Sequence, residues 1–214
     1  MVNVLDKIQP KNKEQLKQLI DYAFKHKQYD LNFIDTSKIT NMSWLFENVK
    51  HNFDISGWDV SNVTNMEFMF CGCIKFNCDL SGWDVSHATD MNHMFFCCNN
   101  FNSDLSNWDV SHVVDMSQMF DCCIEFEGKG LENWNVSKVT DMELMFFKCK
   151  NFNCNLSNWD VSNVTTTFSM FARCKKFNSN LSNWNMANVK TTGYMFIGCD
   201  KMTIPNWYKL YHKK

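Results

Sequence analysis

The residues most able to do chemistry in this sequence are its cysteines. The chain of 214 residues contains eleven of them, so at least one thiol is free or paired between chains. Six recur about 25 residues apart: Cys73, Cys98, Cys123, Cys149, Cys174 and Cys199. Thiols in such a series could form a metal-binding ladder or a redox stack.

Five other cysteines fall outside this series: Cys71, Cys78, Cys97, Cys122 and Cys154. Three of them stand one or two residues before a member of the series, which gives pairs that superficially resemble zinc ligands. Structural zinc sites usually need Cys-x2–4-Cys pairs and four converging ligands. Neighbouring cysteines point in different directions, so we expect no metal site here.

Other candidates for chemistry are weak. Four aspartates recur with the same period, and Asn135 and Asn185 fill the gaps in that column: Asp59, Asp84, Asp109 and Asp160. Calcium binding would suffer from the Asn substitutions, whereas an Asx-turn accepts either residue, so we favour turns. The sequence has no nucleophile elbow, P-loop or His-Glu-x-x-His motif, and we expect no catalytic residues and no cofactor.

A repeat of about 25 residues organises the chain. Its marker tryptophans are Trp58, Trp83, Trp108, Trp134, Trp159, Trp184 and Trp207, with gaps of 25, 25, 26, 25, 25 and 23. The unit reads W-D-V-S-x-V-T-x-M-x-x-M-F-x-x-C-x-x-F-N-x-x-L-S-x, and Trp is taken as position 1. Apolar columns of this kind bury themselves against their own copies in stacked coils.

The repeat also indicates a role for the cysteine series, which occupies position 16. Chemistry needs one site, whereas stacking needs the same residue in every coil. We therefore predict that these six cysteines are a structural column of small buried side chains. Disulfides between adjacent coils are geometrically possible, because strand-spaced Cα atoms fall within the allowed range, but without an export signal we expect most of the thiols to be reduced.

We predict an α/β solenoid. The segment DLSGW alternates like a short parallel strand, and TNMEFMFCG has apolar residues three and four apart, like a short helix opened by a capping box of Thr64 and Glu67. Each coil would then hold one strand and one helical segment. Residues 1–33 would form an N-terminal helical cap, 34–207 about seven coils, and 208–214 a C-terminal cap tail, all within one domain.

The pattern FN-x-D-L-S-x-W-D-V-S-x-V-T-x-M-x-x-M-F-x-x-C, over residues 34–207, resembles the repeat of BspA-like leucine-rich-repeat bacterial surface proteins. That resemblance implies a leucine-rich-repeat-like solenoid, no catalysis, and binding to other proteins. Adhesion to host matrix proteins is the activity most often proposed for such proteins. The family defines no catalytic residues that could be carried over to this chain.

Function should reside in the positions that vary between coils. Large apolar or aromatic residues at positions 10, 11, 14 and 15 form the candidate interaction surface: Phe68, His93, Phe96, Leu144, Phe147, Phe168, Tyr194 and Ile197. Contiguous exposed apolar groups usually mark an interface. The alternative is that these side chains only fill gaps between neighbouring turns.

Composition narrows the class of partner. The formal net charge is −2, and no Lys/Arg stripe of a nucleic-acid binder is present. No apolar run is long enough to span a membrane, and no signal peptide is recognisable. We expect a monomer that binds a protein, cytoplasmic from the lack of a signal, or at the cell surface or secreted from the resemblance. The alternatives to an adhesin-like module are an intracellular scaffold or regulatory module and, third, a thiol- or metal-dependent protein.

Overall fold

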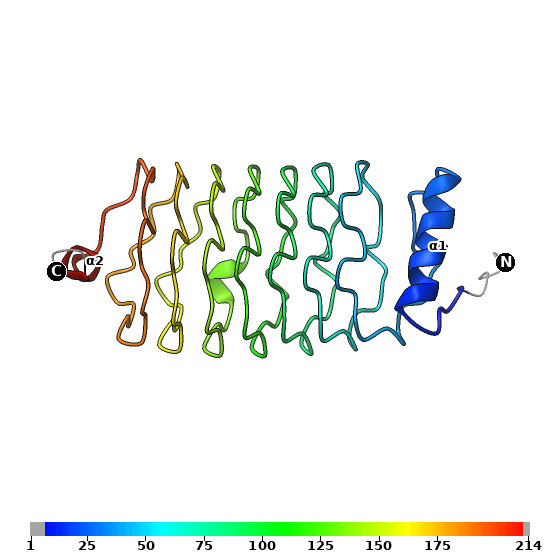
Figure 1. Cartoon of the computed structure of the whole chain (residues 1–214), viewed down its shortest axis with the longest axis horizontal. Coiled ribbons are helices and arrows are strands. Elements are labelled where there is room, and N and C mark those ends of the chain that lie inside the picture. Colours follow the sequence, from blue (N-terminus) through cyan, green and yellow to red (C-terminus); the bar gives the residue numbers. More distant parts are fainter. Residues whose placement is uncertain (1–6, 212–214) are drawn as a thin grey trace.

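The computed structural model describes residues 7–211, which form a row of stacked coils, one coil for each repeat (Figure 1). Helix α1, Lys13–Lys25, lies at the N-terminal end of the row, and helix α2, Asn206–Tyr211, lies at the other end. A single 3-10 turn, η1, spans Leu131–Asn133 within one coil. No helix in residues 7–211 has the length and hydrophobicity to cross a membrane.

The predicted strand in each coil is wrong. Residues 7–211 contain no strand, and the β-type pairing between neighbouring coils consists of isolated parallel bridges, for example Asn65 with Asp90 and Asp90 with Asp115. The DLSGW segment turns instead of extending, because the Trp83 amide donates back to the Leu80 carbonyl at 3.1 Å. The α/β solenoid prediction therefore does not hold.

The predicted helical segment in each coil is also wrong. Within residues 66–73, the amides of Met69 and Cys73 bond to carbonyls three residues earlier, at 3.1 and 2.9 Å. The amides of Phe68 and Phe70 instead bond to carbonyls of the next coil, at 3.0 and 2.9 Å. A helix would use all of these amides internally, so this segment is a run of tight turns.

Side chains from equivalent positions stack along the row and form the core. The phenylalanines at position 13 lie face to face, with ring centroids 5.3–5.9 Å apart and planes within 2–8°. Each marker tryptophan donates its indole N–H to a carbonyl of the preceding coil at 2.8–3.2 Å. These contacts join successive coils through both apolar packing and directed hydrogen bonds.

The two ends of the row differ from its middle. Asn12 caps the N-terminus of helix α1, and its Oδ1 accepts the Gln15 amide at 3.0 Å; the helix buries Leu16, Ile20 and Ala23 against the first coil. At the other end, the Trp207 indole is half-buried. Residues 1–6 and 212–214, which belong to the two predicted caps, lie outside the described residues.

The extra residue in the 26-residue repeat is accommodated by glycine. Gly130 has φ 93° and immediately precedes η1. A Cβ at this position would lie 2.3 Å from the Ser106 amide nitrogen of the preceding coil. No other residue type fits there without moving the neighbouring backbone.

Candidate interaction surface

The runs of tight turns lie next to one another from coil to coil, and we call this band the turn strip. It consists of residues 42–49, 66–73, 91–98, 116–123, 142–149, 167–174 and 192–199. Positions 9, 12, 13 and 16 point into the core, except that Val49 in the first coil and Cys199 in the last are half-buried. Positions 10, 11, 14 and 15 form the outward half of the strip and are mostly half-buried or exposed.

Two outward positions in every coil have a left-handed backbone, with φ of 52–60° at position 11 and 58–72° at position 15. At position 11 these are Trp44, Phe68, His93, Gln118, Leu144, Ser169 and Tyr194. At position 15 they are Asn48, Gly72, Cys97, Cys122, Lys148, Arg173 and Gly198. This conformation costs most residues roughly 1–2 kcal/mol, so the stacking of the coils must impose it.

An aromatic group occupies the N-terminal half of the strip. Phe68 is stacked between Trp44, at a centroid distance of 3.9 Å, and His93, at 4.1 Å, and Phe96 follows 5.6 Å from His93. Burial lowers the pKa of His93, which favours its neutral, stacking form. Sequence reasoning missed Trp44, which is 43% exposed. The signal was its place at position 11 of the degenerate first repeat.

A second apolar group occupies the C-terminal half of the strip. Phe168 meets Tyr194 edge-on at 5.8 Å, and Tyr194 and Ile197 are among the most exposed hydrophobic side chains, at 62% and 56%. Leu144 and Phe147 are half-buried. These two groups contain all eight residues of the predicted interaction surface.

The two groups are not one continuous patch. The coil at 116–123 presents Ser117, Gln118, Asp121 and Cys122 on its outward half. Asp121 is almost fully buried, and its Oδ1 has no hydrogen-bond partner. This polar coil separates the aromatic group from the second apolar group, a division that the sequence analysis did not foresee.

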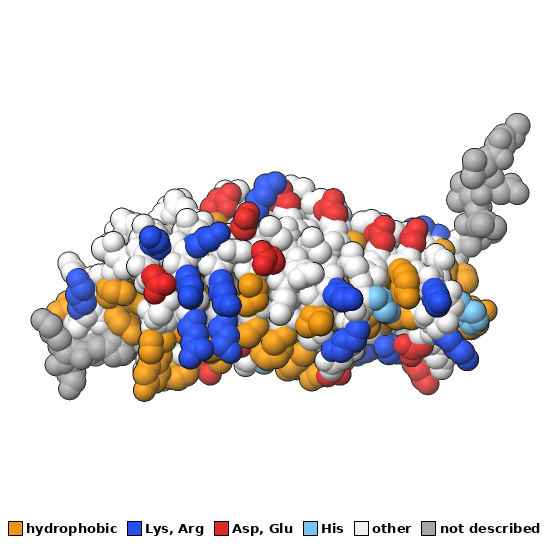
Figure 2. Space-filling view, turned by 90° about the horizontal axis from the view of Figure 1, so that it is seen from above, with side chains coloured by type: hydrophobic (Ala, Val, Ile, Leu, Met, Phe, Trp, Pro, Cys, Tyr) orange, Lys and Arg blue, Asp and Glu red, His pale blue; other side chains and the backbone are white. Residues whose placement is uncertain are grey.

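Positive charge gathers beside the second apolar group. Its members are Lys148, Lys150, Arg173, Lys175 and Lys176, which lie on two neighbouring coils. Lys148 and Arg173 lie 4.8 and 5.9 Å from the Phe147 ring centroid. Figure 2 shows Lys and Arg side chains gathered towards the C-terminal end, next to hydrophobic ones.

We call these five residues the basic cluster. Within residues 7–211 the ion pairs join Lys17 to Asp21 and Lys129 to Asp104, so no ion pair neutralises the cluster. The sequence has no Lys/Arg stripe along the whole chain, yet stacking brings these five residues of two successive repeats together.

The cysteine column lies inside the coils. Each of its six thiols donates to the carbonyl of the position-13 phenylalanine in the preceding coil, at 2.8–3.0 Å. Burial raises the pKa of these thiols, to about 12 for Cys73 and to about 11 for Cys199. In the part of the chain that the structure describes, no three His, Cys, Asp or Glu side chains are placed to hold a metal ion.

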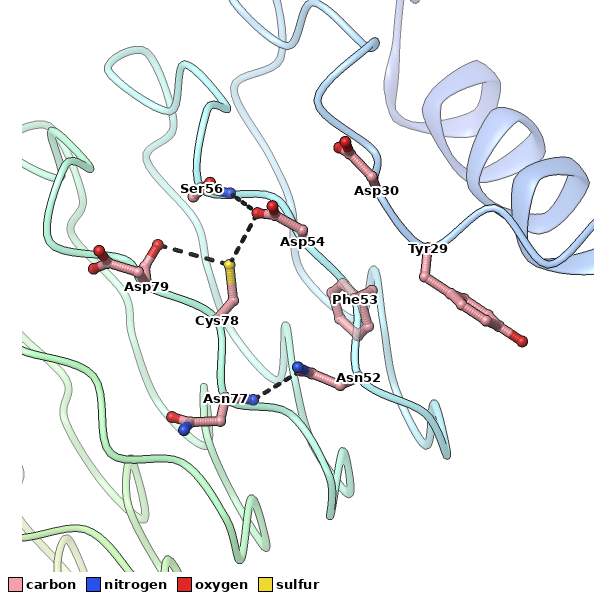
Figure 3. Close-up of a pocket in the computed structure, with 9 residues that line it drawn as sticks. All are labelled: Tyr29, Asp30, Asn52, Phe53, Asp54, Ser56, Asn77, Cys78 and Asp79. Atoms are coloured by element: carbon pink, nitrogen blue, oxygen red, sulfur yellow. Dashed lines mark hydrogen bonds between the residues drawn. The ribbon is translucent and has the colours of Figure 1, made fainter.

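An acidic hollow of about 440 Å³ opens near α1, lined in part by Asp30, Asp54, Cys78 and Asp79 (Figure 3). Its carboxylates serve the backbone: Asp54 accepts the Ser56 amide at 2.9 Å, and Asp79 accepts an amide two residues on at the same distance. These hydrogen bonds lower the pKa of both aspartates. The position-2 aspartates make the same Asx-turns, so both sets are structural.

A comparison with protein families gives two matches, over residues 14–129 and 114–209, to the family described as Mycoplasma protein of unknown function, DUF285. The chain belongs to the DUF285 family. No curated protein and no solved structure matches it. The DUF285 match spans the turn strip, and it brings with it no known ligand, partner or activity.

Proposed function

We propose that this DUF285 chain is a non-catalytic, protein-binding repeat module of the BspA-like type, and that it recognises its partner through the outward half of the turn strip. One observation carries the proposal. The inward positions repeat nearly the same residues in every coil, whereas the outward positions differ and hold exposed aromatic and aliphatic side chains.

The C-terminal half of the strip supports the sharpest expectation about the partner. Tyr194 and Ile197 offer an apolar contact, and the basic cluster beside them is not neutralised by ion pairs. Apolar anchors with a charged surround are typical of protein interfaces, and complementary charge accelerates association. The partner that fits is a protein with an apolar patch bordered by acidic side chains.

Site-specific photo-crosslinking tests this proposal in cells of the source organism. A photoreactive amino acid at Tyr194 should capture one defined protein, whereas the same group at Lys138, which is exposed outside the strip, should capture none in excess of background. Equal capture from both positions would contradict recognition through the strip.

Binding to the purified partner gives the quantitative test. Replacing Tyr194 and Ile197 by Ser should weaken binding at least tenfold, because exposed aromatic anchors commonly carry much of the energy of an interface. Replacing Lys138 by Ser should leave the affinity unchanged. An unchanged affinity of the Tyr194/Ile197 variant would overturn the proposal.

An adhesin-like role and an intracellular scaffold or regulatory role use the same surface and differ in location. The adhesin-like role is the one we propose, on the resemblance of the repeat to BspA-like surface proteins. Digestion of the native protein by protease on intact cells would support it. Protection until the cells are lysed would contradict it and leave the intracellular role.

A further inference from the structure

Two cysteines outside the buried column stand side by side on the turn strip. Cys97 and Cys122 occupy position 15 of neighbouring coils. The Cys97 amide donates to the carbonyl of Asp121 at 2.7 Å, which sets the two cysteines opposite each other. With its amide oriented to satisfy its neighbours, Asn99 donates to the carbonyls of Cys97 and Cys122, each at 3.2 Å. The two backbones are therefore held together on both sides.

The side chains of this pair also interact. Both cysteines are half-buried and free in the structure, so small reagents can reach them. A hydrogen bond from the Cys122 thiol lowers the pKa of Cys97, whereas the same contact and burial raise the pKa of Cys122. A thiol with a lowered pKa is the better candidate for the attacking thiolate at neutral pH.

No other cysteine pair in the described chain combines these properties. The position-16 cysteines also neighbour one another, but they are withdrawn into the core and donate to carbonyls. Cys71 is half-buried, and the residues at its position in the adjacent coils are Glu47 and Phe96. Cys78 and Cys154 share position 21 but lie three coils apart.

We propose that Cys97 and Cys122 form a reversible disulfide between neighbouring coils, made by exchange with a low-molecular-weight disulfide. The Cys97 thiolate attacks one sulfur of the small disulfide, whose S–S bond breaks and releases one small thiolate. Cys97 then carries a mixed disulfide. In this first step the Cys97 sulfur is oxidised and the released sulfur of the small disulfide is reduced, so no further oxidant is needed.

The second step forms the disulfide between Cys97 and Cys122. The Cys122 thiol gives up its proton, and its sulfur attacks the Cys97 sulfur and expels the second small thiolate. Two protein thiols are thereby oxidised, and one small disulfide is reduced to two thiols. The proton of Cys122 passes to the expelled small thiolate, which leaves as a thiol, because the neighbouring Asp121 carboxyl keeps its own proton at neutral pH: burial raises its pKa to about 8. The mixed disulfide also removes the Cys97 contact that most raises the pKa of Cys122.

The geometry of the coils suits this product. Strands in a sheet lie about 4.8 Å apart, and disulfides join Cα atoms separated by roughly 4.4–6.8 Å. Coils that share amide-to-carbonyl hydrogen bonds lie at a comparable spacing. The bridge would fix two coils at the point where the polar coil divides the turn strip, and it does not depend on whether the strip binds a partner.

Intact-mass measurement on the folded protein tests the proposal. The probe is glutathione disulfide in excess, and the background variant is Cys71→Ser, which removes the other half-buried thiol near this pair. We expect the loss of two hydrogen masses, a single cross-linked peptide joining Cys97 and Cys122, and full recovery of both thiols with dithiothreitol. A persistent glutathionyl adduct on Cys97, another cross-link or no reaction would each overturn the proposal.

A second variant separates the two steps. In the same background, Cys122→Ser should stop the reaction at the mixed disulfide, which adds one glutathionyl group at Cys97. Cys97→Ser should react more slowly and give no cross-link, because the thiol with the lowered pKa is gone. Circular dichroism of each variant establishes that the coils are intact. If Cys122→Ser still yields a loss of two hydrogen masses, another pair is responsible and the assignment is wrong.

Discussion

Cys122 and Cys123 are adjacent in the chain, yet they occupy opposite environments. Cys123 is fully buried and donates its thiol to the Phe95 carbonyl at 3.0 Å. Cys122 is half-buried, has a left-handed backbone with φ 62°, and lies beside Cys97 of the preceding coil. The contrast shows that position within the coil, and not residue type, decides whether a side chain builds the stack or faces outwards.

The same contrast extends to the whole turn strip. Its inward half stacks nearly identical residues from coil to coil, and each one contacts its own copies above and below. Its outward half is free to vary, because the turns are closed by backbone hydrogen bonds that need no particular side chain. Substitutions in the two halves should therefore have very different consequences for stability.

The largest expected difference is between Phe120 and Gln118, two residues apart. Phe120 stacks between Phe95 and Phe146, at 5.5 and 5.7 Å. Phe120→Ala should destabilise the protein by about 3–5 kcal/mol, from lost burial and a cavity in mid-stack. Gln118→Ala should change the stability by less than about 0.5 kcal/mol. Urea unfolding measures both.

Stacked repeats can unfold in parts, so two spectroscopic probes should be followed during this titration. Coincident transitions would allow the two free energies to be compared directly. Similar losses for Phe120→Ala and Gln118→Ala would show that the inward and outward halves are not distinct.

Asp121 is a buried carboxyl group in the outward half, and it should make stability depend on pH. Burial raises its pKa to about 8, whereas in the unfolded chain it should be about 4. The folded state therefore holds a proton that the unfolded state has released, and the free energy of unfolding should fall as pH rises from about 4 to 8.

Asp121→Asn keeps the shape and cannot ionise. At pH 8 the variant should be more stable than the parent by several kcal/mol, because each unit by which the folded-state pKa exceeds the unfolded one is worth about 1.4 kcal/mol. At pH 4 the two proteins should be nearly equal. Thermal unfolding at both pH values measures this, and a parallel pH dependence in the variant would place the titrating group elsewhere.

Substitutions of the adjacent residues Cys123 and Cys122 should have smaller effects on stability, and they are compared under reducing conditions. Cys123→Ala loses the thiol donor to the Phe95 carbonyl and leaves a small void, which should cost about 1–2 kcal/mol. The carbonyl keeps its bond from the Cys98 amide, at 2.9 Å, and this limits the loss. Cys122→Ala should cost less than about 0.5 kcal/mol. Equal effects would contradict the structural role of the column.

The core could be predicted from the sequence, and the backbone could not. Position 13 recurs as Phe in coil after coil, and self-similarity alone predicts that such residues stack. Met66, Met69, Phe70 and Cys73 are spaced three and four apart because the turns bring every such residue inwards, and a helix produces the same spacing. Periodicity therefore could not distinguish turns from a helix, because the difference lies in which amides bond to the next coil.

For the candidate site, too, the sequence predicted some features and not others. Variability between repeats selects residues of the outward half, such as Phe68 and Tyr194, because side chains at these positions need not match their copies in the neighbouring coils. Trp44 was missed because it lies in the degenerate first repeat. The burial of Asp121 could not be foreseen, because residues at its position range from exposed Ile197 to buried Ala172.

Glycine substitutions at and near a left-handed position should change the free energy of unfolding least, and in opposite directions. Ser169 has φ 52°, whereas Ala172, three residues later in the same coil, is not among the residues with positive φ. Both are small and buried. Glycine relieves the left-handed strain at residue 169, so Ser169→Gly should stabilise the protein by about 0.5–1 kcal/mol. Ala172→Gly relieves no such strain and should destabilise the protein by a similar amount, through the greater freedom of glycine in the unfolded chain.

Chemical denaturation of the two variants beside the parent gives both free energies. If both substitutions are destabilising, then the turns do not hold Ser169 under strain, and the left-handed backbone costs the outward half of the strip little.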